Sequence, residues 1–156
     1  MNSSGTLSYE TSGIIKTTNQ DVNLASRIKI ILAGLEEVIE QCKPDCVAIE
    51  KVFLNTNPQS TLLLGQARGA AISAAVIKNL DVYEYTALQV KKSVVGMGHA
   101  SKSQVQIMVQ KLLNLPSIPT SDSADALACG ICHANISGSL AKFGTGNRMK
   151  SGRIIW

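Results

Sequence analysis

The sequence predicts a single α/β domain in which buried strands alternate with helices. Residues 46–49, CVAI, form a short continuous apolar run, which is typical of a strand buried on both faces. A second strand candidate lies at 82–85, and helical patterns flank both runs. A chain of 156 residues is long enough to bury the core of one domain.

Polar capping residues and apolar spacing place the remaining elements. Asn57 followed by Pro58 is a typical helix start, because Asn accepts a hydrogen bond from a free N–H and Pro suits the first helical position. Residues Leu7–Lys16 contain two β-prone pieces around a polar turn and predict a hairpin. The expected helices run from Asp21 or Asn23 to about Gln41, from Pro58 to about Lys78, from Thr86 to Val94, from Lys102 to Leu113, and from Thr120 or Ser121 to about Ala134.

The excess positive charge lies at the end of the chain. Residues 1–141 contain 11 basic and 11 acidic side chains, so the net charge of +4 comes from Lys142, Arg148, Lys150 and Arg153. We therefore divide the chain into a domain at 1–137 and a basic flexible tail at 138–156. Such a tail suits phosphate contact, although many basic tails are simply solvated.

The sequence also bears on the compartment. No run approaches the 18 or so apolar residues of a membrane span, and Met1–Tyr9 lacks the basic start and apolar centre of a signal peptide. The expected location is the cytoplasm, without membrane contact.

The cysteines allow two interpretations. Cys129, Cys132 and His133 spell CxxCH, the pattern of c-type haem attachment, and together with Cys42 and Cys46 they could also form a zinc site. However, the cluster falls within an alanine-rich helical stretch, where free cysteines behave as small hydrophobic residues. We predict buried thiols. A haem or zinc protein is the alternative, which absorption spectra and metal analysis would reveal.

Three acids are candidates for a metal site. Glu50 follows the first strand at its carboxyl end, where open α/β sheets bind ligands. Asp122 and Asp125 share one face of the first turn of the last helix. Ordinary explanations are a solvated loop residue for Glu50 and helix capping for the aspartates. If the three converge, their oxygens suit Mg²⁺, and two such ions can assist phosphodiester cleavage.

Four motifs in order resemble RuvC-type Holliday junction resolvases: AIEKVF (48–53), LGQARGAA (64–71), QVKKSVVGMGHASKSQVQ (89–106) and SDSADALA (121–128). The similarity covers roughly residues 7–135. It implies a ribonuclease H-like fold, a mixed sheet flanked by helices. It also implies a homodimer that cuts four-way DNA junctions with Mg²⁺ in recombination and repair, with two ions per active site, alongside the RuvA–RuvB branch-migration complex.

The resemblance also assigns roles to individual residues. Glu50, Asp122 and Asp125 match the catalytic, metal-binding acids of the family. Phe53 matches the aromatic residue that stacks at the junction point, and Lys91 and Lys102 match basic residues that contact DNA or support the site. From the sequence alone, Phe53 equally suits a minor core position, and the lysines suit a solvated face.

One family motif has no match in this sequence. Family members begin with a strand that ends in a Gly-Ile-Asp-Pro-Gly-like motif, whose aspartate is a fourth catalytic acid. We therefore expect the central first strand to be absent from this chain, through truncation or a start codon placed too far downstream, which the upstream DNA sequence would test. The alternative function is a truncated, catalytically impaired junction-binding protein.

Overall fold

The computed structural model describes residues 6–17, 23–51 and 57–142, with side chains up to residue 138. Within these residues, the sheet has two parallel strands, β1 (Cys46–Glu50) and β2 (Asp81–Tyr85). Cys46 lies opposite Asp81 at the start of the pair, and Glu50 lies opposite Tyr85 at its end. Both strands predicted from the sequence are therefore confirmed.

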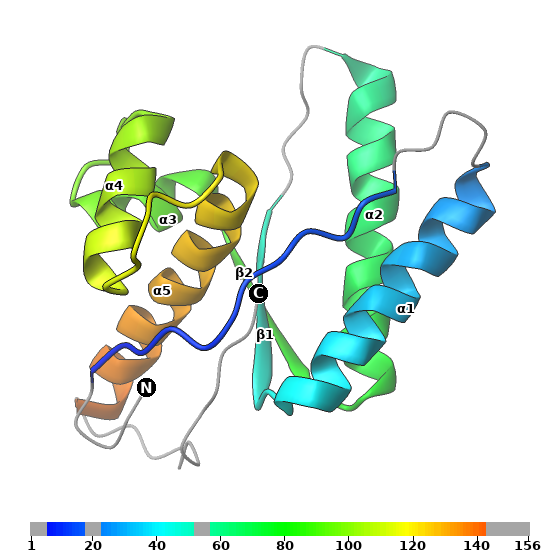
Figure 1. Cartoon of the computed structure of the whole chain (residues 1–156), viewed down its shortest axis with the longest axis horizontal. Coiled ribbons are helices and arrows are strands. Elements are labelled where there is room, and N and C mark those ends of the chain that lie inside the picture. Colours follow the sequence, from blue (N-terminus) through cyan, green and yellow to red (C-terminus); the bar gives the residue numbers. More distant parts are fainter. Residues whose placement is uncertain (1–5, 18–22, 52–56, 143–156) are drawn as a thin grey trace.

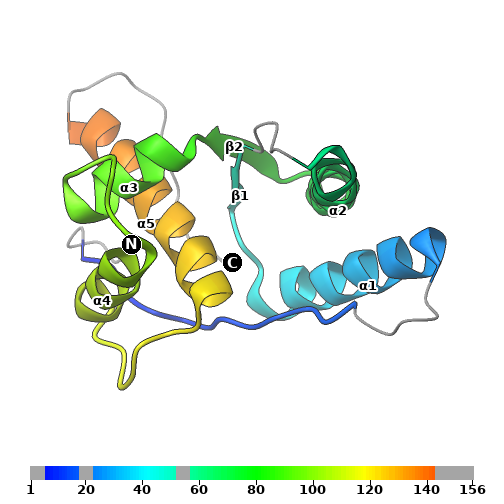
Figure 2. The same ribbon diagram turned by 90° about the horizontal axis from the view of Figure 1, so that it is seen from above.

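Helices cover the sheet on both sides. The α1–α2 pair lies on one side and the α3–α5 group on the other, with the strands between them (Figures 1 and 2). Parallel strands are usually buried in this way, because the helices that connect them pack onto the faces of the sheet. The helices are α1 (Leu24–Cys42), α2 (Pro58–Ile77), α3 (Ala87–Val95), α4 (Lys102–Leu112) and α5 (Ser121–Lys142).

Side-chain caps explain where the first four helices begin. Asn23 accepts a hydrogen bond from the Ser26 backbone N–H, and Asn57 accepts one from Gln59, with Pro58 at the first position of α2. The predicted helix starts are therefore confirmed. Reciprocal capping boxes, Thr86 with Gln89 and Ser101 with Gln104, open α3 and α4.

The last helix is longer than the sequence predicted. We expected it to end near Ala134, but α5 continues to Lys142 and so includes the first residues of the predicted basic tail. Ala134 and Ser137 are both buried, so tertiary packing supports the helix beyond the expected end. The remainder of that tail, 143–156, lies outside the described residues.

The predicted hairpin at Leu7–Lys16 is wrong. Residues 6–17 form an extended segment without a strand ladder, which runs from the α4–α5 side to α1 (Figure 1). Leu7 packs against the core, and a Cβ on Gly34 of α1 would lie 2.9 Å from Ile15 Cδ1. An isolated two-stranded hairpin is only marginally stable. Contacts with the helices fix this segment instead.

The core lies between the sheet and the α3–α5 group. Val47 and Ala48 of β1 are both 2% exposed. Ala48 belongs to the central cluster, whose other buried side chains come from the end of β2, from α3, α4 and α5, and from the connection between α3 and α4. This packing fixes where β1 ends relative to α5. The cluster contains Ala48, Tyr85, Val90, Val94, Ala100, Val105, Val109, Ala128, Cys129, Ile131 and Cys132.

Helix α2 is unusually apolar and exposed. It is long and apolar enough to cross a membrane by length and composition, contrary to the sequence-based expectation, although core helices of globular proteins pass the same test. Only 17% of the apolar 18-residue stretch of α2 is buried, and Leu62 and Ile77 are 63% and 64% exposed. Its Arg68 side chain pairs with Glu84 of β2, and α2 packs against α1. These contacts place α2 as an outer helix of this domain with an uncovered apolar face.

Candidate active site at the carboxyl end of β1

Glu50 is the last residue of β1, and it stands where a buried strand emerges from the core. The buried side chains of Val47 and Ala48 anchor the strand in the core. The Lys51 N–H donates to the Tyr85 carbonyl at 2.8 Å, which fixes the strand end against β2. Glu50 itself is exposed. Its carboxylate therefore lies at the end of the sheet where ligands bind in open α/β folds.

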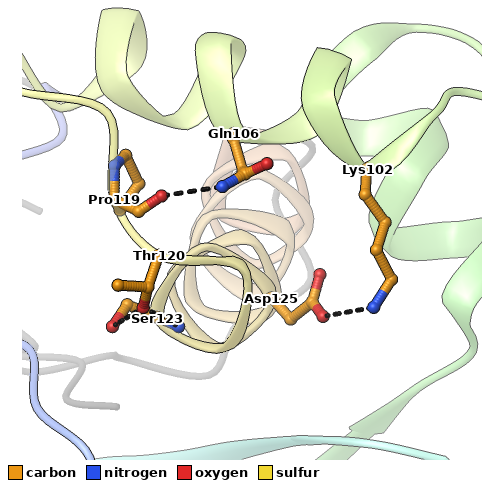
Figure 3. Close-up of polar contacts among 6 residues, drawn as sticks. All are labelled: Lys102, Gln106, Pro119, Thr120, Ser123 and Asp125. Atoms are coloured by element: carbon orange, nitrogen blue, oxygen red, sulfur yellow. Dashed lines mark hydrogen bonds and ion pairs between the residues drawn. The ribbon is translucent and has the colours of Figure 1, made fainter.

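The start of α5 is fixed next to α4. Thr120 caps α5: its Oγ1 accepts from the Ser123 N–H at 3.4 Å, and its carbonyl accepts from the Ala124 N–H at 2.8 Å. Gln106 of α4 donates from Nε2 to the Pro119 carbonyl at 2.9 Å (Figure 3). These bonds position the start of α5, and Asp125, one turn after Asp122, projects toward Lys102.

Asp125 lies close enough to Glu50 to affect the pKa of Glu50. Burial raises the pKa of Glu50 above its usual value, and the Asp125 carboxylate raises it further, whereas Lys91 and Lys102 oppose the shift. Lys102 Nζ also lies 3.8 Å from an Asp125 oxygen, an ion pair between partly exposed groups (Figure 3). Two carboxylates and two ammonium groups from β1, α3, α4 and α5 thus meet at one end of the sheet.

Two predicted site residues remain, Asp122 and Phe53. Asp122 lies in the first turn of α5 with an exposed side chain, and no contact joins it to Glu50. Within the described part of the chain, no three His, Cys, Asp or Glu side chains lie together closely enough to hold a metal ion. Phe53 lies outside the described residues. Among the predicted residues, the structure joins Lys102 to Asp125 directly, and Asp125, Lys91 and Lys102 act electrostatically on Glu50.

The donor set nevertheless suits a divalent cation. Two carboxylates held near each other repel, and a cation between them removes that repulsion. Mg²⁺ in particular usually takes only one or two carboxylates and completes its shell with water and substrate phosphate. Glu50 and Asp125 meet that requirement.

Sequence reasoning missed Arg68, which touches the end of β1. Its Nε donates to the Glu50 carbonyl at 3.3 Å, and its guanidinium pairs with Glu84 of β2. The available signal was a single arginine in the otherwise small and apolar stretch LGQARGAA, but the sequence does not say toward which neighbour this side chain points.

The CxxCH segment is part of the core. Cys132 and His133 are 0% and 2% exposed, and burial raises the pKa of Cys129 to about 12. His133 Nδ1 lies 2.7 Å from the Tyr85 hydroxyl, and Nε2 lies 3.3 Å from Cys46 Sγ. A metal-binding cysteine must be a thiolate. The prediction of buried thiols is confirmed for Cys129 and Cys132, whereas Cys42 and Cys46 are only partly buried. Within the described residues, no group of His, Cys, Asp or Glu side chains could hold a metal ion.

Comparison with known proteins identifies the class and then the family. A sequence model described as "Crossover junction endodeoxyribonuclease RuvC" matches residues 1–133, and the structural neighbours share the ribonuclease H-like fold of that class. The chain is therefore a nuclease with a ribonuclease H-like fold. The match covers well over half of its length, so the chain belongs to the RuvC family, which implies the use of a divalent metal ion.

Close relatives support the same assignment. The crossover junction endodeoxyribonuclease RuvC of Methylobacillus flagellatus is 61% identical over 154 residues, covering 96% of this chain and 86% of that protein. The protein of the same name from Dechloromonas aromatica is 57% identical over 150 residues, covering 96% and 83%. Both relatives are named as nucleases, which favours a nuclease over the alternative of a catalytically impaired binding protein.

Two solved structures have the same fold. Thermus thermophilus RuvC in complex with a Holliday junction substrate superposes with a TM-score of 0.79 at 31% identity, covering 93% of this chain and 86% of that one. A second T. thermophilus RuvC structure has a TM-score of 0.69 at 32% identity, covering 85% and 78%. The predicted fold class is confirmed.

Proposed function

We propose that this chain resolves four-way DNA junctions by metal-dependent phosphodiester hydrolysis. The names of its relatives and the junction-bound T. thermophilus structure support this substrate. One observation within the chain carries the proposal: Glu50 and Asp125 converge beside Lys91 and Lys102 at the carboxyl end of β1.

We assign Glu50, Asp122 and Asp125 as the catalytic acids and the metal ligands, with Mg²⁺ as the ion, of which the intact family would hold two per site. Bound Mg²⁺ supplies an activated water and stabilises the leaving oxygen. Glu50 must be ionised to act as a ligand, and its raised pKa means that protons compete with the metal at this position. Asp122 is included because it lies one turn from Asp125 on the same helix face.

Lys91 and Lys102 are the proposed contacts to the DNA backbone. Lys102 neutralises Asp125 in the free protein at 3.8 Å, an exposed pair worth at most about 1 kcal/mol. A phosphate and a divalent cation can therefore separate this pair at little cost. Phe53, outside the described residues, is proposed to stack on a base at the junction centre, since aromatic rings bind unpaired bases in this way.

We further propose that the chain acts as a cytoplasmic homodimer through α2. Leu62, Gly65, Gly69, Ser73 and Val76 share one face of this helix, and Leu62 and Val76 are 63% and 58% exposed. A Cβ added at Gly65 or Gly69 would meet nothing within 4 Å. Such a face of small and apolar residues suits close packing against a second copy. The RuvA–RuvB complex is a proposed partner by family resemblance.

The test uses three single substitutions, Glu50→Gln, Asp122→Asn and Asp125→Asn, with labelled four-way junction and plain duplex in Mg²⁺ or EDTA. We expect the wild-type protein to cut the junction only in Mg²⁺, and each variant to lose at least about 100-fold in rate while still binding the junction. Asp81→Asn, at the opposite end of the sheet, is the matched control and should cut normally.

Two outcomes would contradict the assignment. Junction binding by the wild-type protein without any Mg²⁺-dependent cleavage would support the alternative, a binding protein with impaired catalysis. Normal cleavage by Asp122→Asn alone would remove this residue from the site and leave Glu50 and Asp125.

A further inference from the structure

Arg68 connects α2 to the ends of both strands. Its Nε donates to the Glu50 carbonyl at 3.3 Å, and its guanidinium forms an ion pair with Glu84 of β2. The guanidinium group is planar and carries five N–H donors, so it can hold two acceptors at once in a fixed geometry. One side chain thus fixes the carboxyl end of β1 relative to β2 and α2.

Arg68 approaches from the side of the sheet opposite to the acids. Successive side chains of a strand point to opposite faces. In the observed register Glu50 lies opposite Tyr85, which points to the α5 side and contacts His133. Glu84 precedes Tyr85 and therefore points to the α2 side, where it meets Arg68. Arg68 consequently holds the backbone of Glu50 and leaves its carboxylate free to face Asp125.

The Glu50 carbonyl is available to a donor from α2. Lys51 N–H makes the bond to β2, at 2.8 Å to the Tyr85 carbonyl, so the Glu50 backbone one position earlier faces away from β2. At this exposed strand end the carbonyl can bond water or a side chain, and in the structure it accepts from Arg68. This bond lies at the residue whose side chain the proposed reaction depends on.

We propose that Arg68 is a positioning residue that holds the end of β1 so that Glu50 reaches the metal together with Asp125. This inference rests on the proposed function of Glu50. Because the Arg68–Glu84 pair is partly exposed, with side chains 23% and 41% accessible, its loss should cost little overall stability. The loss should appear in the geometry of the site.

The test compares Arg68→Gln and Arg68→Lys with the wild-type protein. We expect Arg68→Gln to lower kcat for junction cleavage about 10- to 100-fold and to weaken Mn²⁺ binding, measured without DNA, by a similar factor. The KM and the junction Kd should stay within about twofold of wild type. Arg68→Lys should recover part of the loss, because a lysine keeps the charge but not the planar fork.

Lys78→Gln is the matched control, because it removes another ion pair of α2, the one with Glu40 of α1 at 2.8 Å, at the helix end away from Glu50. It should leave kcat, Mn²⁺ binding and the Lys51 amide NMR resonance unchanged, whereas Arg68→Gln should shift that resonance.

Three results separate the possible explanations. Normal kcat and normal Mn²⁺ binding in Arg68→Gln would overturn the inference. A raised KM and junction Kd with unchanged kcat would also overturn it and would make Arg68 a DNA contact. If the wild-type protein itself does not cleave, the proposed function fails, and the Mn²⁺ affinity and the Lys51 resonance still decide whether Arg68 positions the end of β1.

Discussion

At the scale of single residues, the buried His133 side chain makes the stability of the core depend on pH. Its ring is 2% exposed and lies between the Tyr85 hydroxyl at 2.7 Å and the Ser137 hydroxyl at 3.1 Å, with Cys46 also in contact. Burial lowers the pKa of His133 below its usual value of 6.5. The folded protein therefore keeps this ring neutral at a pH at which the unfolded chain would already bind a proton.

This depressed pKa predicts an acid-sensitive fold. Stability from a neutral His133 is complete above pH 6.5 and is lost as the pH falls from there toward the lower folded-state pKa. We expect the Tm to decrease between pH 7 and pH 5. In His133→Gln, which removes the titrating group, the Tm should be lower at pH 7 but should change less over the same range.

Thermal unfolding followed by circular dichroism measures how the Tm changes with pH in the wild-type protein and in His133→Gln. The difference between the two proteins isolates His133, because Glu50 and Glu40 titrate in both. If the Tm changes equally with pH in the two proteins, the His133 ring does not cause the loss of stability in acid.

The same residue shows what the sequence could and could not predict. Apolar neighbours were enough to predict that Cys129 and Cys132 are buried, but the burial of His133 was not predicted. The contact of His133 with Cys46 joins positions 87 apart, so no local pattern reports it. Glu50 and Asp125 were recognisable as candidates because each belongs to a local motif. Arg68 was not recognisable, because its contact is also a long-range one. Its role depends on a carbonyl acceptor 18 positions away, which carries no sequence signal of its own.

At the scale of elements, local chemistry predicted the helices well. Asn57–Pro58 and the two capping boxes satisfy free N–H groups with side chains a few residues away, so the starts of α2, α3 and α4 can be read from short stretches. The end of α5 and the extended segment 6–17 were misjudged because long-range packing decides both. The sequence of a helix end or a strand does not include its packing partner.

Gly96 gives a stability prediction at this scale. It caps the C-terminus of α3 with φ = 82°, a left-handed conformation that disfavours any residue with a Cβ. Gly96→Ala should lower the free energy of unfolding by about 1 kcal/mol, measured in urea.

Gly13→Ala is the matched control for Gly96→Ala. Both sites have open space around an added Cβ, but only Gly96 has a positive φ. The control should be neutral or slightly stabilising, because alanine restricts the unfolded chain. Equal losses in both variants would refute the backbone explanation.

At the scale of the whole molecule, the two sides of the sheet differ in how well they are covered. The α3–α5 group buries its apolar side chains in the central cluster, whereas α1 has no buried residue and α2 buries only three alanines. Large apolar patches on a soluble domain usually mark an interaction surface. A helix face built from Leu62, Gly65, Gly69, Ser73 and Val76 is the part of that side best suited to a second copy of the chain.

Leu62→Glu tests this interface, since a charge placed within an apolar contact opposes association. We expect size-exclusion chromatography with light scattering to give a dimer for wild type and a monomer for the variant, with little change in monomer Tm because Leu62 is 63% exposed. Ile118→Glu, 54% exposed in the connection between α4 and α5, should stay dimeric. If Leu62→Glu remains a dimer, this face is excluded as the interface.

Cutting two opposite strands of one junction requires two active sites, so a monomeric variant should also lose paired cleavage of the junction.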